Sequence, residues 1–234
     1  MRRLLAAPLL ACVLPVAAGD LPTLGDLTQD QFRRLSEDLG AALSYKGVTP
    51  ATPLGALGFD VGIEVSATDI QNSDLFRLAG NSAPDYIVVP RLHVYKGLPW
   101  GFDIGAFVGG ATEVDATVYG LDARWAVLDD GVATPAVALR LSGTQSSDIG
   151  GLKVTTFAGD LMVSKKLTIA TPYLGVGVVR TNADPGIGGL SDETFNKSRV
   201  FGGVNLNLAV VNLAFEAEKL GDNTTLSAKA GWRF

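Results

Sequence analysis

The chain divides into two stretches that differ in hydrophobic periodicity. From Ala56 to the last residue, Phe234, apolar and polar residues alternate. The clearest example runs from Leu57 to Ala67, where every second residue is apolar and the residues between are glycine, acidic or serine. A period of two is typical of a β-strand with one apolar and one polar face. The pattern recurs between turn signals, and it predicts about ten strands of an all-β fold, joined as consecutive hairpins.

The fourth predicted strand, from about Glu113 to Leu128, interrupts this alternation. Its apolar positions change phase where Val118 is followed directly by Tyr119. A β-bulge inserts one extra residue into a strand and would produce such a shift. We therefore expect a bulge near Tyr119.

Residues 26–44 show a period near 3.6 instead and predict one amphipathic helix. Its apolar stripe contains Phe32, Leu35, Leu39, Ala42 and Leu43, and its charged face contains Arg33, Arg34, Glu37 and Asp38. Thr28 and Gln31 have the spacing of a capping box at the amino-terminal end of a helix. The two prolines between Lys46 and Pro53 predict a linker that ends the helix.

The first 18 residues resemble a secretory signal peptide. Arg2 and Arg3 precede an apolar run that ends in small residues, and the favoured cleavage site follows Ala18. The alternative is a lipoprotein signal acylated at Cys12, although the apolar run continues past that cysteine. Cys12 is the only cysteine, so the mature chain is expected to form no disulfide and no thiolate metal site.

Composition narrows the class of protein further. The net charge of −5 argues against nucleic-acid binding. The mean hydropathy of +0.26 is high, yet no later run is long and apolar enough for a membrane helix. The 28 glycines favour strands over helices. These features leave a large buried β core or a sheet whose apolar face meets lipid.

Two features favour lipid over a soluble, lipocalin-like core. The polar face carries small and charged residues that suit a narrow lumen. In addition, hairpin threading brings Trp100, Trp125 and Trp232 to one end of the barrel, as expected for an aromatic girdle at a membrane boundary. We expect these three tryptophans to be interfacial.

The final segment, from Leu226 to Phe234, alternates without a fault and ends in an aromatic residue. In this it resembles the bacterial outer-membrane β-barrel proteins. The resemblance covers Ala56 to Phe234 and indicates a superfamily, without a named subfamily. It implies a cell outer-membrane location in a Gram-negative-type envelope, contact with outer-membrane lipid, and recognition of Trp232 and Phe234 by the barrel-assembly machinery.

Charges of both signs recur on the polar face. The carboxylates are Asp60, Glu64, Asp103, Asp122, Asp160, Glu216 and Glu218, and the cations are Arg91, Arg124, Arg140, Lys229 and Arg233. Unpaired charges in a narrow interior are costly, so a structural network across the lumen is a better explanation than a catalytic pair of carboxylates. Such a network predicts a filled lumen and no wide pore.

His93, the only histidine, shares this face and joins the predicted network. Catalysis would require a serine or carboxylate partner in an accessible cleft, and the chain has no Gly-x-Ser-x-Gly motif. Asp184, Asp192 and Glu193 lie in a glycine-rich stretch, 181–197, but their spacing matches no EF-hand. We therefore predict no catalytic residue, no metal and no cofactor.

The sequence thus predicts three parts: a signal peptide (1–18), a periplasmic helix and linker (19–55) and a transmembrane barrel (56–234). The helix is expected to lie across the periplasmic mouth, with its charged face in water. The preferred function is non-enzymatic: envelope support, loop-mediated binding or weak, porin-like passage of small solutes. The alternatives are a barrel enzyme acting on lipid or peptide, and a soluble periplasmic barrel that binds an apolar ligand.

Overall fold

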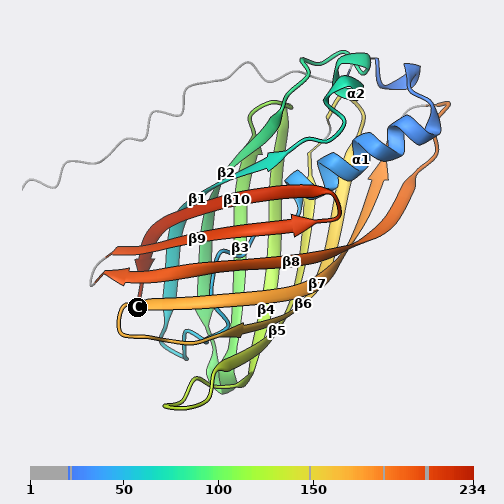
Figure 1. The fold of residues 1–234 in the computed structure, drawn as a ribbon. Helices are drawn as coiled ribbons and strands as arrows, with labels where there is room; N and C mark the ends of the chain where they lie inside the picture. The colour runs from blue at the N-terminus through green and yellow to red at the C-terminus, as the bar shows by residue number, and fades with distance from the viewer. Residues whose placement is uncertain (1–20, 22, 148, 187, 209–210) are drawn as a thin grey trace, which may run out of the picture.

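The computed structural model describes residues 21, 23–147, 149–186, 188–208 and 211–234, so the predicted signal peptide and Cys12 lie outside the described residues. Ten antiparallel strands close into a barrel (Figure 1). They are β1 (Phe59–Asp69), β2 (Tyr86–Gly97), β3 (Phe102–Ala111), β4 (Ala116–Leu128), β5 (Ala136–Ser146), β6 (Lys153–Ser164), β7 (Ala170–Asp184), β8 (Glu193–Leu208), β9 (Val211–Leu220) and β10 (Asn223–Arg233).

Each strand pairs with its neighbours in the sequence, and β1 pairs with β10 to complete the ring. Two backbone hydrogen bonds extend this seam, because Phe59 N donates to Phe234 O at 2.6 Å and Phe234 N donates to Phe59 O at 2.9 Å. The predicted up-and-down barrel of ten strands is confirmed.

Side chains alternate between the outside and the inside along every strand, as the period of two requires. Large apolar side chains such as Ile63, Leu141 and Val178 are exposed on the outer face. Charged side chains such as Glu64 and Arg140 are buried on the inner face. The barrel therefore has an apolar outside and an ionic inside, the reverse of a soluble protein.

The two ends of the barrel differ. We call the end where β1 begins and β10 ends the chain-end mouth, and the opposite end the loop-side mouth. The longest connection, between β1 and β2, lies at the loop-side mouth and contains the short helix α2 (Ser73–Leu78). The β2–β3 connection at the chain-end mouth is a single turn of 3₁₀ helix, η2 (Pro99–Gly101). In barrels of this kind the long loops face the outside of the cell and the short turns face the periplasm.

A short 3₁₀ turn, η1 (Leu24–Asp26), precedes the main helix, α1 (Gln29–Leu43). The predicted capping box is confirmed, because Thr28 Oγ1 accepts from Gln31 N while Thr28 N donates to Gln31 Oε1. Among the residues that the structure describes, no helix is long and apolar enough to cross a membrane.

The predicted position of this helix is wrong. We expected α1 across the mouth where β1 begins, but it enters the barrel at the loop-side mouth (Figure 1). Asp38, expected in water, is buried and accepts hydrogen bonds from Asn72 N at 2.9 Å and from Asn223 Nδ2 at 2.6 Å. The apolar stripe explains the difference, since the inner wall at this mouth is itself apolar and buries that stripe more fully than a rim could.

The bulge expected near Tyr119 is also absent from β4. Pairing with β3 continues unbroken through Tyr119, and the register shift lies between Ala126 and Leu128. Ala116 and Val118 keep the inward phase and are buried in the apolar cluster around α1. The apparent change of phase therefore marks a strand whose inner face turns from polar to apolar where it joins this cluster.

Candidate functional site

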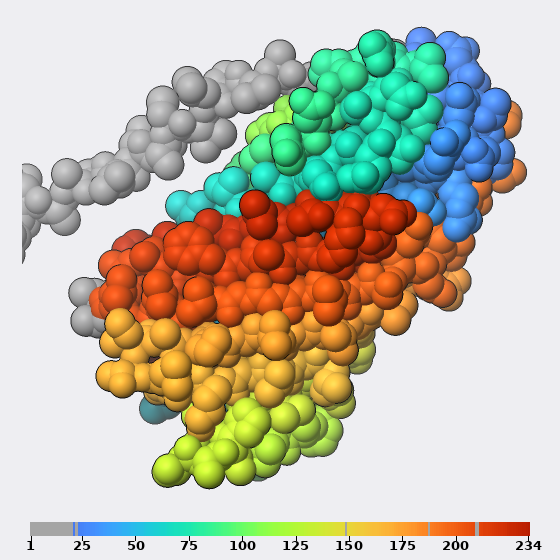
Figure 2. Space-filling view, viewed as in Figure 1, coloured from blue at the N-terminus to red at the C-terminus, as the bar shows by residue number. Residues whose placement is uncertain are grey.

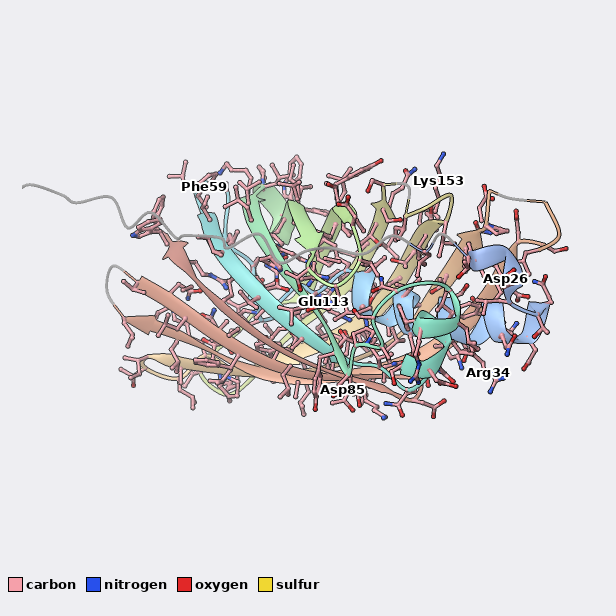
Figure 3. The ribbon with its side chains drawn as sticks, turned by 90° about the horizontal axis from the view of Figure 1, so that it is seen from above. Asp26, Arg34, Phe59, Asp85, Glu113 and Lys153 are labelled. Carbon is pink, nitrogen blue, oxygen red and sulfur yellow. The ribbon has the colours of Figure 1, made fainter. Side chains whose placement is uncertain are left out.

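The lumen is the candidate functional site, and it is occupied by the chain's own residues 29–54, which we call the plug. The plug consists of α1 followed by a segment without regular secondary structure, residues 44–54. Figure 3 shows Arg34 of α1 at one end of the barrel and Phe59, the first residue of β1, at the other. The chain therefore crosses the whole lumen before the first strand begins.

Hairpin register places opposite charges directly across from each other on the inner wall. Glu64 is the register partner of Arg91, and Asp103 is the partner of Arg124. Their side chains form ion pairs, with Arg91 Nη1 2.8 Å from Glu64 Oε1 and Arg124 Nη2 2.5 Å from Asp103 Oδ2. All four side chains are almost fully buried. The pairing compensates part of the cost of removing these charges from water.

The remaining predicted wall charges also find partners. Arg140 Nε lies 2.8 Å from Asp160 Oδ2, and Lys229 Nζ lies 3.0 Å from Asp60 Oδ2. Arg233, nearer the chain-end mouth, approaches the same Asp60 carboxylate at 3.9 Å. Ion pairs between neighbouring strands thus line the lumen at several points of the wall.

Among the described residues, two carboxylates without a cation in ion-pair distance accept hydrogen bonds from tyrosine hydroxyls. Tyr173 Oη donates to Glu216 Oε2 at 2.9 Å, and Tyr45 Oη donates to Asp122 Oδ1 at 2.5 Å. The hydroxyls of Tyr45 and Tyr95 lie 2.8 Å apart, so the plug and the wall share this part of the network. The sequence analysis omitted all three tyrosines, although Tyr95 and Tyr173 lie at inward positions of their strands.

His93 is enclosed on all sides. Its Nε2 lies 2.7 Å from Glu64 Oε2, and its ring stacks on Phe107 and Tyr95 with centroid separations of 5.3 and 5.9 Å. The side chain is fully buried. Within the described part of the chain, Glu64 is the only carboxylate within 4 Å of the His93 ring nitrogens. A histidine in this position can orient Glu64, but it cannot reach a substrate in solution.

The plug contributes one of the two cations beside Glu218. Lys46 Nζ forms a buried ion pair with Glu218, and Arg199 Nη1 lies 3.5 Å from the same carboxylate. Arg199 also donates from Nε to Asp160 Oδ1 at 3.0 Å. The sequence analysis missed both cations. Lys46 fell in the predicted linker, and Arg199 fell just before the predicted start of its strand, yet its inward phase would have revealed it.

Cations of the wall and the plug bind the carboxyl-terminal end of α1. Arg91 Nη2 donates to Ala42 O at 3.0 Å and to Ser44 O at 3.4 Å, while Lys46 Nζ donates to Ala41 O at 2.9 Å. The last carbonyls of a helix have no partner within it and carry a partial negative charge. These cations therefore satisfy the end of the helix inside the lumen.

The segment after α1 is held through its backbone. Tyr95 Oη donates to Gly47 O at 3.0 Å, Arg124 Nη1 donates to Pro50 O at 2.5 Å, and Leu54 N donates to Asp103 Oδ1 at 3.1 Å. A Cβ on Gly47 would lie 1.9 Å from Nη1 of Arg140, so any other residue here would displace that guanidinium. The neighbouring Val48 has a φ of 42°, which a β-branched residue adopts only when its surroundings impose it.

At the other end of the plug, Asp38 binds the loop-side connections. It accepts from Gln71 N at 3.2 Å in addition to Asn72 and Asn223. Burial raises the pKa of the Asp38 carboxyl, although these hydrogen bonds act in the opposite direction. The plug is thus fixed at both of its ends and along its middle.

The chain-end mouth contains a cavity of about 440 Å³. Pro50, Thr52 and Pro53 of the plug line it together with Thr171, Asn205 and Arg233 of the wall. The plug lines one side of this cavity, so a solute that enters from the chain-end mouth meets the plug and the buried ion pairs beyond it.

The predicted interfacial aromatics lie at the chain-end mouth. Trp100 is in η2, Trp125 stacks on Phe102 with a centroid separation of 5.6 Å, and Trp232 is the register partner of Val61. All three indoles are exposed on the outside of the barrel. The side chain of Phe234 is also exposed and stacks on Phe59.

The glycine-rich stretch 181–197 is shorter as a loop than expected, because β7 continues to Asp184 and β8 begins at Glu193. Glu193 binds the plug, accepting from Gln29 Nε2 at 2.5 Å and pairing with Arg33 at 3.3 Å. Among the residues that the structure describes, no group of three or more histidine, cysteine or acidic side chains could hold a metal ion.

Comparisons with known proteins give only distant likenesses. No family model matches the chain, and no curated protein matches it in sequence. Among solved structures, the KdgM porin in complex with disordered oligogalacturonate is 9% identical with a TM-score of 0.42, over 75% of this chain and 99% of that chain. Neisserial surface protein A is 14% identical with a TM-score of 0.31, over 76% and 96% of the two chains.

A third structure, the attachment invasion locus protein Ail of Yersinia pestis in complex with sucrose octasulfate, is 12% identical with a TM-score of 0.25, over 76% of this chain and 97% of that chain. All three TM-scores lie below 0.5, so the classification rests on the geometry of this chain. A closed, even-numbered antiparallel barrel with an apolar outer face and an ion-paired interior has the architecture of an outer-membrane β-barrel protein.

Proposed function

We propose that the protein is a sealed, non-enzymatic outer-membrane barrel with a structural role in the envelope. The observation that carries this proposal is the plug. Residues 29–54 occupy the lumen from the loop-side mouth to the chain-end mouth and are bound there by buried side chains. A barrel filled in this way supports no diffusion of solutes, so weak porin-like passage is not part of the proposal.

The fixed position of the plug is open to a direct test. A Cβ built on Gly40 of α1 lies 3.3 Å from the Cβ of Thr181 on β7, close to the separation that a disulfide requires. Cys12 is the only other thiol of the sequence, and a Cys12→Ser background removes it. We therefore suggest the double variant Gly40→Cys/Thr181→Cys, studied oxidised and reduced in planar lipid bilayers.

We expect the wild-type protein and both redox forms of the variant to give no conductance above the bare bilayer. A matched control, Gly55→Cys/Thr181→Cys, should form no disulfide, because Gly55 lies beyond the plug near the chain-end mouth. Conductance in the reduced form that disappears on oxidation would show that the plug leaves the lumen, and steady conductance of the wild type would contradict a sealed barrel.

The non-enzymatic part of the proposal rests on the burial of His93. Diethyl pyrocarbonate should leave His93, the only histidine, unmodified in the folded barrel and should modify it after unfolding. Rapid modification of His93 in the folded barrel would show that reagents reach this side chain. That result would favour the alternative that the barrel is an enzyme.

We also propose that Trp232 and Phe234 form the signal read by the barrel-assembly machinery. Phe234 supports this proposal because its side chain is exposed beside the β1–β10 seam. Deletion of Phe234 should lower the amount of folded, protease-resistant barrel in outer membranes, and Trp232→Ala should lower it less. Wild-type amounts after the deletion would contradict the assignment.

A further inference from the structure

The direction in which the plug runs has a consequence for the topology of the whole chain. The carboxyl-terminal end of the plug joins β1 at the chain-end mouth, where Leu54 N donates to Asp103 and Lys96 Nζ donates to Ala56 O at 2.7 Å. Its amino-terminal end lies at the opposite mouth. Gln29 there exchanges two hydrogen bonds of 2.9 Å with the backbone of Ser191, in the β7–β8 connection.

The residues that precede α1 are part of the loop-side surface. Thr23 N donates to Ala79 O at 3.1 Å, and Thr23 Oγ1 donates to Leu78 O at 2.8 Å, which ties this segment to the β1–β2 connection. Leu21 is buried, and its backbone lies about 3 Å from the position that a Cβ on Gly150 would occupy in the β5–β6 connection.

The segment from Thr23 to Thr28 is partly exposed. Thr23, Gly25, Asp26 and Thr28 are exposed, whereas Leu24 and Leu27 are buried against the apolar cluster around α1. Figure 2 shows this first described stretch, in blue, beside the β1–β2 connection, in teal and green, at one end of the molecular surface. Figure 3 places Asp26 at the end of the barrel opposite Phe59.

We infer that the chain enters its own barrel from outside the cell, so that residues 23–28 form part of the outer surface together with the β1–β2 and β7–β8 connections. Both ends of an even-numbered barrel lie on the periplasmic side. The plug reverses this for the segment ahead of it, because the plug carries the chain through the lumen to the other side of the membrane. The inference does not depend on the proposed structural role, since a conducting barrel could have the same topology.

This topology also constrains assembly. The lumen around residues 44–54 is lined by side chains that are almost fully buried, including Arg91, Arg124 and Arg199. A chain end cannot be threaded through such a filled interior after the ring has closed. The residues ahead of β1 must therefore be in place, with Asp26 on the loop side, before β1 pairs with β10.

Cysteine labelling in intact cells tests this inference. Cys12 is the only cysteine, so Cys12→Ser gives a background without thiols. Asp26→Cys places a thiol in the segment ahead of α1. Arg77→Cys marks the loop-side mouth and Val132→Cys marks the chain-end mouth, and all three positions are exposed. Each variant is first shown to be folded by its heat-modifiable migration on a gel.

A maleimide that cannot cross membranes should label Asp26→Cys and Arg77→Cys to the same extent in intact and lysed cells, whereas Val132→Cys should be labelled only after lysis. Protection of Asp26→Cys while Arg77→Cys is labelled would overturn the threading. Labelling of Val132→Cys while the other two variants are protected would overturn the outward direction. Neither result would bear on whether the barrel conducts, so this test and the bilayer measurements fail independently.

Discussion

The two halves of the plug occupy the same lumen but are held by different chemistry. The wall around α1 is mainly apolar, and Ile87, Val89 and Val118 belong to the same buried cluster as the apolar stripe of the helix. The wall around residues 44–54 is ionic and donates hydrogen bonds from Arg91, Arg124 and Arg199.

The difference follows from the backbone. An α-helix satisfies most of its own amide and carbonyl groups, so it needs only apolar neighbours to be buried. A segment without regular structure leaves those groups without partners, and burial without partners is costly. The wall must then supply donors and acceptors. Arginine suits this role because its guanidinium can bind a carboxylate and a carbonyl at the same time.

The largest effect should come from removing a donor in the ionic half. Arg124→Met leaves the buried Asp103 carboxylate without its cation and Pro50 O without its donor, and we expect a loss of about 3–5 kcal/mol in the free energy of unfolding. Urea titration of the barrel in lipid vesicles measures it. Arg34→Met, which removes an exposed pair with Asp30, should cost at most about 1 kcal/mol. Equal costs would show that the ionic contacts do not hold this half.

The apolar half should respond to loss of volume instead. Leu39→Ala removes a fully buried side chain from the cluster around α1 and should cost about 2–5 kcal/mol in the same titration. The matched change Leu57→Ala, at an exposed position near the chain-end mouth, should shift stability by about 0.5 kcal/mol or less. If the two variants are equally stable, burial does not hold the helix.

The outer face provides the next test, because it should tolerate charge least where lipid replaces water. Val178→Arg introduces a cation on the exposed apolar face of β7 and should cost about 2–4 kcal/mol near the membrane midplane. Val132→Arg makes the same change in the exposed β4–β5 connection and should have little effect. Similar tolerance at both sites would argue that Val178 meets water.

The smallest effect should come from the cap of α1. Thr28→Ala removes the acceptor for Gln31 N and should cost about 1 kcal/mol in the free energy of unfolding. Thr28→Ser keeps the hydroxyl and should retain most of the stability. A loss as large as that of Leu39→Ala would mean that the cap, and not apolar burial, decides whether α1 stays in the lumen.

Most of the fold could be predicted from strand periodicity, because the alternation depends only on which face of the sheet each residue occupies. It predicted ten strands and the inward position of the wall charges from Asp60 to Arg233, with the exception of Arg199. The same rule failed at Ala116 and Val118. There the inward face is apolar because it belongs to the buried cluster around α1, and a local pattern cannot tell lipid from a buried apolar cluster.

The plug escaped prediction for a related reason. The amphipathic stripe showed that α1 must be buried, but burial at the rim and burial in the lumen give the same sequence pattern. Lys46 lay in a segment with two prolines, which is typical of a linker, and its partner Glu218 is 172 residues away. Contacts at such separation depend on the closed ring and leave no local signal.

The backbone hydrogen bonds between Phe59 and Phe234 have a mechanical consequence. A pull on the segment ahead of α1 is transmitted along residues 44–54 to the start of β1, where those bonds and the β1–β10 ladder resist it. Because the plug runs back beside β1, this load points toward the carboxyl-terminal end of the strand. It would open the ladder one bond at a time from Phe59, once the buried hydrogen bonds of residues 44–54 have broken. The hydrogen bonds of the plug therefore bear tension applied from the loop-side surface before the β1–β10 seam does.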